Sequence, residues 1–313
     1  MDGLPFWPRD ASVTARTVDT IAIGELVVVA LILLLVFGMM FSFVIRYRRG
    51  SKADRSHRAT KTWRFEIAWT SATLVAFLVL FAFGAKAYLY LYQPPKADLE
   101  LYVVAKQWMW KIQYPGGQRE IDSLHVPIGK VVRVVLGSED VIHGFYIPAF
   151  RVKRDVVPGT YEVLWFEATA IGDFRLECSQ FCGTDHAKMT GAVHVLSPAD
   201  YASWLASQNA GQTLAQQGEA LFRQYGCSGC HSPRSTIHAP LLDGIYGNYV
   251  HLADGRTLLA DERYIRDCIL LPASQRVAGY PPVMPSFDGQ IPEDDLMKLI
   301  AYIQSLGTAK EAP

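Results

Sequence analysis

Residues 178–189 read Cys-Ser-Gln-Phe-Cys-Gly-Thr-Asp-His-Ala-Lys-Met, and this stretch is the most informative part of the sequence about its fold. Four side chains with metal-binding atoms fall within these twelve residues: Cys178, Cys182, His186 and Met189. Two thiolates, an imidazole and a thioether form a soft donor set, which selects copper over magnesium or calcium. Three other interpretations stay open: a disulfide between the two cysteines, a zinc site, which has no need of the methionine, and core residues that bind nothing.

The residues on either side of this stretch have the pattern of short β-strands. Segments rich in β-branched and aromatic side chains alternate with turns of glycine, proline and aspartate, which is typical of a β-sandwich or barrel of about 100 residues. We expect this domain to cover residues 93–197. Its clearest predicted strands are Leu99–Ala105, Val131–Leu136, Tyr161–Glu167 and Ala192–Leu196.

The stretch 178–189 resembles the binuclear copper (CuA) loop of cytochrome c oxidase subunit II, a cupredoxin-fold domain behind a two-helix membrane anchor. The resemblance continues in residues 138–148, where the family's other histidine ligand lies, and in residues 105–110, which are similar to the family's aromatic segment beside the copper. Together with the two apolar helices described below, it covers about residues 20–200.

The resemblance implies a role in copper binding for six residues. The cysteines would bridge two copper ions, each histidine would bind one ion, the methionine would be a weak ligand, and the glutamine would contribute its backbone carbonyl. These implied ligands are His143, Cys178, Gln180, Cys182, His186 and Met189. No open position would remain for a substrate, so such a site relays electrons.

The resemblance also implies roles for two residues outside the ligand set. Trp108 corresponds to the family's electron-entry tryptophan, although a stacked core aromatic is the alternative. Glu66 corresponds to a glutamate on one proton-uptake path, and an interfacial charge at a helix end is the alternative. Two positions depart from the family pattern. Gln180 replaces the frequent glutamate, which puts the family's magnesium site in doubt, and Thr73 replaces the usual proline.

A second redox motif, Cys227-Ser-Gly-Cys230-His231, is the attachment signature of c-type haem. Its two thiols add across the haem vinyl groups, and the histidine that follows them reaches the iron. Taken alone, the motif also fits a thioredoxin-like pair or half of a zinc site. Met284 follows His231 by 53 residues, in a segment similar to the distal-ligand loop of class I cytochromes c. Histidine and methionine together give a six-coordinate electron carrier. We expect Cys268 and Met297 to be structural.

Apolar spacing becomes helical after Leu214 and predicts an all-α domain over residues 214–308, ending in a helix over Glu293–Leu306. Residues 198–213 read as a linker and residues 309–313 as a tail. A linker of this kind suggests the hypothesis that the haem domain swings between its donor and the copper centre.

Two uncharged apolar runs, Leu26–Ile45 and Ile67–Ala85, are long enough to cross a membrane. They predict transmembrane helices at about residues 22–46 and 66–88, within an N-terminal region of residues 1–92. The connector, residues 46–64, has a net charge of +7. By the positive-inside rule this connector is cytoplasmic, so both termini and both redox domains lie on the periplasmic or outer side.

The whole chain of 313 residues has 30 basic and 30 acidic residues, so its formal net charge is zero. That balance excludes a bulk polyanion binder, and we expect no nucleic-acid partner. It hides a polarised chain, since residues 1–45 carry −2, the connector +7 and residues 65–313 −5. A charged fraction of 19%, below the usual 25% or so, and a mean hydropathy of +0.12 disfavour disorder and indicate a membrane-linked protein.

These features together predict a multidomain membrane protein: a two-helix transmembrane hairpin, a β-sandwich cupredoxin domain and an all-α class I cytochrome c domain. The resemblance implies subunit II of a caa-type, proton-pumping cytochrome c oxidase in a bacterial inner membrane. Its cofactors would be the binuclear copper (CuA) centre and one covalent haem c. Its partners would be subunits I and III, an external electron donor and membrane lipid, and oxygen would be reduced in subunit I.

Two alternatives stay open. The first is a membrane-anchored electron shuttle or copper-delivery protein without an oxidase partner. The second is the same subunit in a nitric-oxide-reducing relative. A quinol oxidase subunit II is disfavoured because such subunits lack the copper ligands, and all of those ligands are present here.

Overall fold

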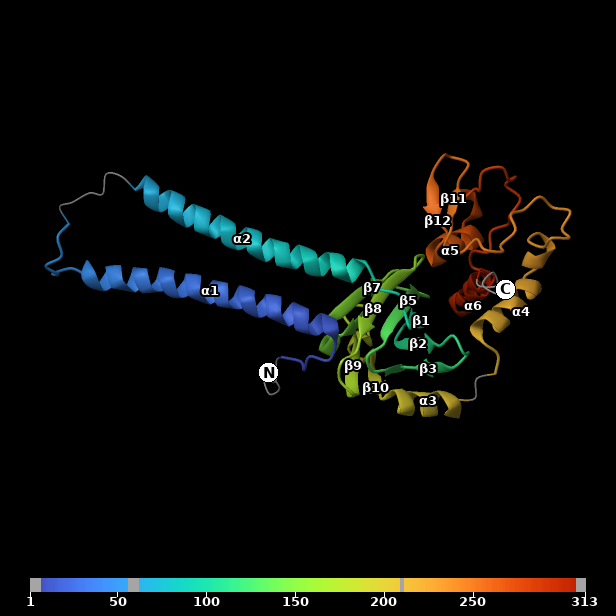
Figure 1. Cartoon of the computed structure of the whole chain (residues 1–313), viewed down its shortest axis with the longest axis horizontal. Helices are drawn as coiled ribbons and strands as arrows, with labels where there is room; N and C mark the ends of the chain where they lie inside the picture. Colours follow the sequence, from blue (N-terminus) through green and yellow to red (C-terminus); the bar gives the residue numbers. More distant parts are fainter. Residues whose placement is uncertain (1–6, 56–61, 209–210, 308–313) are drawn as a thin grey trace. The chain divides into compact units, whose positions relative to one another are not determined.

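The computed structural model describes residues 7–55, 62–208 and 211–307 (Figure 1). The chain divides into two compact units. One unit is the helical pair over residues 13–94, and the other contains residues 95–307 together with residues 7–12. Of the basic connector, residues 56–61 lie outside the described residues, and they include His57.

The first unit consists of the helices α1 (Val13–Arg46) and α2 (Trp63–Tyr92) (Figure 1). Both are long and apolar enough to cross a membrane, and no residue in their most apolar windows is buried within the protein. Each helix extends past its predicted span, α1 by nine residues at its start. The apolar run sets the length that a bilayer covers, whereas the helix continues until a cap or a breaker ends it.

The second unit begins with a sandwich of two five-stranded sheets. One sheet has the strand order β3-β2-β1-β5-β8 and the other the order β4-β10-β9-β6-β7. The predicted strands are confirmed to within two residues at each end. The strands are β1 (Leu99–Lys106), β2 (Met109–Gln113), β3 (Arg119–Ile121), β4 (Ser123–Pro127), β5 (Val131–Ser138), β6 (His143–Ile147), β7 (Val152–Val156), β8 (Glu162–Glu167), β9 (Gly172–Cys178) and β10 (Thr190–Leu196).

Side chains from both sheets form the core of the sandwich, with Trp110, Phe145 and Phe166 among the largest fully buried ones. The segment before α1 adds an edge to this domain. Ala11 donates its N–H to the carbonyl of Ala149, and its own carbonyl accepts from the N–H of residue 169. The small side chain of Ala11 is fully buried in the core of the sandwich. The N-terminal region predicted over residues 1–92 therefore contributes residues to this domain.

The predicted linker over residues 198–213 is wrong for its first ten residues, which form helix α3 (Pro198–Ser207). Ser197 caps the helix by accepting a hydrogen bond from the N–H of Asp200, and Pro198 occupies its first turn. Trp204 stacks on His125 of β4 at a ring-centroid distance of 4.5 Å. Six of its ten residues are apolar, and one of them, Trp204, anchors the helix to the sandwich.

The remaining residues form a small helical domain. Helices α4 (Leu214–Gln224) and α6 (Glu293–Ser305) pack against each other, and α5 (Glu262–Leu270) packs on α6. Gly218 allows the close approach of α4 and α6, since a Cβ there would lie 2.0 Å from the carbonyl oxygen of Lys298. Two short strands, β11 (Tyr249–His251) and β12 (Thr257–Leu259), form a hairpin. Short 3-10 turns complete the chain at Pro148–Phe150, His186–Lys188, Cys227–Gly229 and Pro272–Ser274.

Candidate metal and haem centres

The predicted copper ligands meet at one end of the sandwich. Cys178 is the last residue of β9 and His143 the first of β6, and these two strands pair in the same sheet. The loop after β9 carries Cys182 and His186 and returns at Met189, immediately before β10. Adjacent strand ends therefore bring together residues that lie up to 46 positions apart in the sequence.

The two cysteine sulfurs lie at the centre of this group, 3.7 Å apart. The Sγ atom of Cys178 lies 3.2 Å from the carbonyl oxygen of Gln180 and 4.0 Å from Nδ1 of His143. On the other side, Sγ of Cys182 lies 3.5 Å from Nδ1 of His186 and 3.8 Å from Sδ of Met189. The six donors thus form two sets around one shared pair of sulfurs.

This geometry excludes a disulfide between Cys178 and Cys182, because bonded sulfurs lie about 2.05 Å apart. It fits metal ligation. Two thiolates at about 2.3 Å from a tetrahedral ion are separated by roughly 3.8 Å. The ligand atoms of His143, Cys178 and Cys182 also lie within 4.8 Å of one another. A copper ion therefore fits among the residues present.

Asp140 fixes the orientation of one histidine. Nε2 of His143 donates to its Oδ1 at 2.9 Å, which leaves Nδ1 facing the sulfurs. The Asp140 carboxylate is itself held by the backbone N–H of Gln107 at 2.7 Å. A carboxylate behind a ligating histidine is the usual device that fixes its tautomer and ring position. The sequence contains a signal for this residue, an aspartate three positions before the histidine, but its role was not predicted.

The two thiols differ in acidity. Burial would raise the pKa of Cys178, but hydrogen bonds with His143 and with the backbone of Gly144 outweigh it and lower that pKa to about 6. Burial and the neighbouring Cys178 raise the pKa of Cys182 to about 12. The pair therefore holds one thiolate readily at neutral pH, and a bound cation favours loss of the second proton.

The aromatic segment before β2 contacts the same loop. Nε1 of Trp108 and Nε2 of Gln107 both donate to the carbonyl oxygen of Cys182, at 3.1 and 2.8 Å. Trp108 is partly exposed, whereas Trp110 is fully buried and packs edge-on against Phe145. Trp110 is thus a core residue, whereas Trp108 contacts the copper loop and is partly exposed.

The side chain of Gln180 does not point at the other donors. Its Nε2 donates to Oδ2 of Asp155 on β7 at 2.9 Å, while its backbone carbonyl faces Cys178. The residue therefore retains the backbone contact expected of a ligand. Its amide is engaged within the chain, at the position where many family members have a glutamate. This contact with Asp155 was not predicted.

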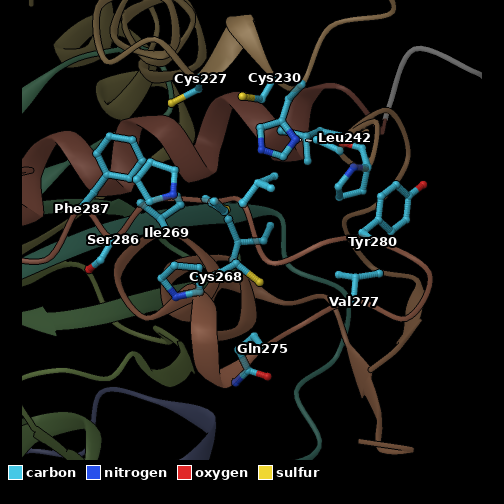
Figure 2. A pocket seen from close by; sticks show the side chains of 18 of the residues that line it. Cys227, Cys230, Leu242, Cys268, Ile269, Gln275, Val277, Tyr280, Ser286 and Phe287 are labelled. Atoms are coloured by element: carbon cyan, nitrogen blue, oxygen red, sulfur yellow. Dashed lines mark hydrogen bonds between the residues drawn. The ribbon is translucent and has the colours of Figure 1, made fainter. Parts of the chain in front are cut away.

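A cavity of about 670 Å³ lies in the helical domain (Figure 2). Cys227 and Cys230 lie along one side of it, and Cys268 lies on another. Its lining is mostly apolar, and Met284 and His231 both contribute to it. Its volume is that of a pocket for one large organic cofactor. A flat, largely apolar group such as haem fits these walls, with two thiols available at the edge.

His231 is fixed for ligation through one nitrogen. Its Nδ1 donates to the carbonyl oxygen of Pro240 at 2.8 Å, so Nε2 is free of that proton and available to a metal. Met284 lies in the loop between α5 and α6, where it packs against the core of this domain. The rings of Phe222 and Tyr302 contact each other at a centroid distance of 5.2 Å, which joins the first and last helices of this domain.

The remaining predicted residues lie apart from both groups. Glu66 is exposed in the first turn of α2 and accepts a hydrogen bond from Thr62. Met297 is fully buried in α6, as predicted for a structural residue. Among the other described histidines, His125 pairs with Glu120 and His194 with Asp173. His238 stacks on Tyr280, and His251 contacts Thr257.

The fold and the two sites define a membrane-anchored electron-transfer protein with one copper domain and one haem domain. The comparisons agree with this class. Residues 118–196 match the family model "Cytochrome C oxidase subunit II, periplasmic domain", and residues 215–307 match the model "Cytochrome c". The chain therefore belongs to the cytochrome c oxidase subunit II family and carries a cytochrome c domain. The relatives in this family are cytochrome c oxidase subunit 2, which is a component of an oxidoreductase complex. The expected cupredoxin-like fold is confirmed.

The chain is similar to individual proteins over different parts of its length. Cytochrome c oxidase subunit 2 of Alkalihalophilus pseudofirmus is 28% identical and covers 90% of this chain and 85% of its own length. The subunit of Cereibacter sphaeroides is 31% identical, covering 49% of this chain and 64% of its own length. The periplasmic domain of subunit II of cytochrome oxidase of Bradyrhizobium japonicum is similar to 37% of this chain. It is 37% identical, with 96% of its own length covered and a TM-score of 0.36.

Proposed function

We propose that the chain is subunit II of a proton-pumping, caa-type cytochrome c oxidase of a bacterial inner membrane. It accepts electrons from an external donor in its cytochrome c domain and passes them through its copper domain to subunit I, where oxygen is reduced to water. The observation that carries this proposal is the presence, on one chain, of two donor sets around a shared sulfur pair and a haem-sized cavity with two thiols.

The residues of each site have defined tasks in this proposal. His143, Cys178, Gln180, Cys182, His186 and Met189 would hold the copper centre, Gln180 through its backbone carbonyl. Cys227, Cys230, His231 and Met284 would hold haem c, with the two cysteines supplying thioether bonds. When bound, these groups supply two one-electron carriers with no vacant coordination position.

The chain's own contribution is to hold these ligands still. Asp140 keeps Nδ1 of His143 directed at the sulfurs, and the carbonyl of Pro240 keeps Nε2 of His231 directed away from it. Fixed ligands limit rearrangement when the charge of a site changes, which favours rapid electron transfer. Trp108, on the solvent side of the copper loop, serves as an electron-entry residue. Glu66 serves proton uptake at the start of α2.

The proposed topology follows from charge. The basic connector between α1 and α2 stays in the cytoplasm, so the copper and haem domains are periplasmic. Subunits I and III, the external donor and membrane lipid are the proposed partners. A shuttle or copper-delivery protein differs in one measurable respect, because it would be purified without a large haem-containing subunit.

The test uses the full chain, purified in mild detergent from the membranes of its own organism, and three cysteine variants. We expect a c-type haem spectrum, a mixed-valence copper EPR signal and co-purifying oxidase haems. Cys182→Ser should lose the copper signal and keep the haem, whereas Cys227→Ser should lose a covalent haem bond and keep the copper. Cys268→Ser is the matched control and should keep both. Absence of the copper signal in the copper-loaded wild type would overturn the proposal.

A further inference from the structure

Strand β1 is covered on both faces. The five residues from Leu101 to Ala105 are all at most 3% exposed. Leu101, Val103 and Ala105 face the core of the sandwich, whereas Tyr102 and Val104 belong to the core of the cytochrome c domain. A strand in a sheet with one solvated face would show alternating exposure, and β1, which pairs antiparallel with β2 and parallel with β5, does not. The outer face of this sheet is therefore covered by the cytochrome c domain.

A partly buried ion pair crosses this surface. Arg133 of β5 donates from Nη1 and Nη2 to the two carboxylate oxygens of Glu262, at 2.8 and 3.1 Å. Glu262 begins α5, is 3% exposed and also accepts a hydrogen bond from the hydroxyl of Tyr246. Arg133 in turn pairs with Glu100 of β1 at 2.5 Å. Without Arg133 the Glu262 carboxylate would be buried and uncompensated, so the pair favours one arrangement of the two domains.

Two further polar contacts lie elsewhere on the same surface. Arg266 of α5, 5% exposed, donates to the carbonyl of Gly159 at 2.6 Å and lies over the ring of Tyr161. Lys111 of β2 pairs with Asp294 of α6 at 3.3 Å. Three separate contacts with the copper domain define both the position and the rotation of the cytochrome c domain, which a single flexible tether does not.

The docked domain places α6 beside the strand that leads to the copper ligands. Gly137 of β5 has no side chain, and a Cβ there would lie 3.2 Å from Cε of Met297. On α6, Leu299 and Ile303 line the haem-type cavity. This one helix therefore packs against β5 and also forms a wall of the cavity.

From Gly137 the chain continues directly to the copper site. Oγ of Ser138 donates to the carbonyl of Val141 at 2.6 Å, and Asp140 accepts from His143 at 2.9 Å. Covalent bonds and short hydrogen bonds thus connect the docked surface to a proposed copper ligand.

We propose that the cytochrome c domain remains docked on the outer face of the copper domain's first sheet, held by the Arg133–Glu262 pair, and that electrons pass between the two domains in this docked arrangement. The proposal rests on the proposed function for its electron-transfer part. It replaces the hypothesis that the domain swings on its linker. The end of that linker is itself attached, since the N–H of Leu214 donates to the carbonyl of Pro115.

The experiment compares the full chain with Arg133→Glu, with the charge-swapped double variant Arg133→Glu/Glu262→Arg, and with a control, Arg256→Glu. Arg256 forms an exposed pair with Asp254 in the β11–β12 hairpin. Amide hydrogen exchange in β1 and α6 reports docking. The rate of haem-to-copper electron transfer after flash reduction is measured at several viscosities. It shows whether electrons pass in the docked arrangement or only after the domain has moved.

We expect a rate independent of viscosity in the wild type and in Arg256→Glu. Arg133→Glu should weaken docking by about 100-fold or more, with faster exchange and a slower, viscosity-dependent rate, and the double variant should restore both in part. The proposal would be overturned if Arg133→Glu had the same amide hydrogen exchange and the same electron-transfer rate as the wild type. A wild-type electron-transfer rate that depends on viscosity would also overturn it. Copper and haem loading are verified first by EPR and absorbance. Failure to load counts against the proposed function, whereas hydrogen exchange still tests docking.

Discussion

Gly218→Ala is expected to destabilise the cytochrome c domain by separating its first and last helices. A Cβ at this position would lie 2.0 Å from the carbonyl oxygen of Lys298 and 2.8 Å from Cβ of Tyr302. Carbon and carbonyl oxygen normally approach to about 3.3 Å, so α4 and α6 would have to move apart by roughly 1 Å. The collision is with backbone, which has no rotamer that avoids it.

The magnitude follows from two opposing effects. Overpacking of a core costs about 1–3 kcal/mol, and a collision with backbone lies at the upper end of that range. The higher helix propensity of alanine offsets about 1 kcal/mol. The net loss in the free energy of unfolding is therefore about 2 kcal/mol, which is close to a 30-fold change in the folded-to-unfolded ratio.

The assay is guanidinium unfolding of the haem-loaded chain, followed by the haem absorbance, which reports this domain alone. Gly211→Ala is the matched control, because a Cβ there meets no atom within 4 Å and its φ is not in the left-handed region. A Gly218→Ala protein that unfolds within about 0.5 kcal/mol of the control would refute the packing argument.

Three other predictions concern single side chains. Burial alone would raise the pKa of Glu262, but Arg133 outweighs it and the net pKa is lowered. The stability that the Glu262 carboxylate contributes is thus complete above about pH 4.5 and is lost as the pH falls through the lowered pKa. Between pH 6 and 3, the melting temperature of Glu262→Gln should therefore fall less than that of the wild type. Burial raises the pKa of Cys268 to about 11, and iodoacetamide at pH 8 should leave it unlabelled in the loaded chain; labelling in the folded protein would contradict this. Met189→Leu, a volume-conserving change in the core, should cost less than about 1.5 kcal/mol and alter the copper EPR spectrum but not the haem spectrum; an unchanged copper spectrum would exclude Met189 as a ligand.

Local patterns were enough to predict the elements and the donor sets. Strands such as Leu99–Lys106 were predicted to within one residue, because β-branched runs bounded by turn residues specify a strand without distant information. The ligand sets were recognisable for a similar reason, because each of the two motifs, residues 178–189 and 227–231, contains most of its donors within one short segment. The structure brings Cys178, Cys182 and His186 close together, and their roles as copper ligands stay a prediction.

The features that sequence patterns missed depend on distant residues. Arg133 and Glu262 are 129 positions apart, and neither has a neighbour in the sequence that indicates an ion pair. Helix α3 was read as part of a linker because Ser197-Pro198 ends the predicted β-domain and a polar stretch, Ser207–Thr213, follows the helix. Its anchor is one ring, Trp204, stacked on His125. Likewise, the segment around Ala11 is too short to specify a strand, and its backbone hydrogen bonds with residues 149 and 169 hold it against the sandwich.

One sequence signal for the docked surface was nevertheless present in β1. The run Leu101-Tyr102-Val103-Val104-Ala105 has no polar residue at alternate positions, whereas a strand with one face in water needs them. An unbroken apolar strand in a two-sheet sandwich therefore implies a second covering layer. Residues 214–307 supply that layer here, through Leu296, Ile300 and Met297 of α6 in the same cluster as Tyr102 and Val104. A subunit II chain whose β1 alternates apolar and polar residues should accordingly leave this face of the sheet in water, and comparison of the β1 sequences of chains with and without a cytochrome c domain tests that rule.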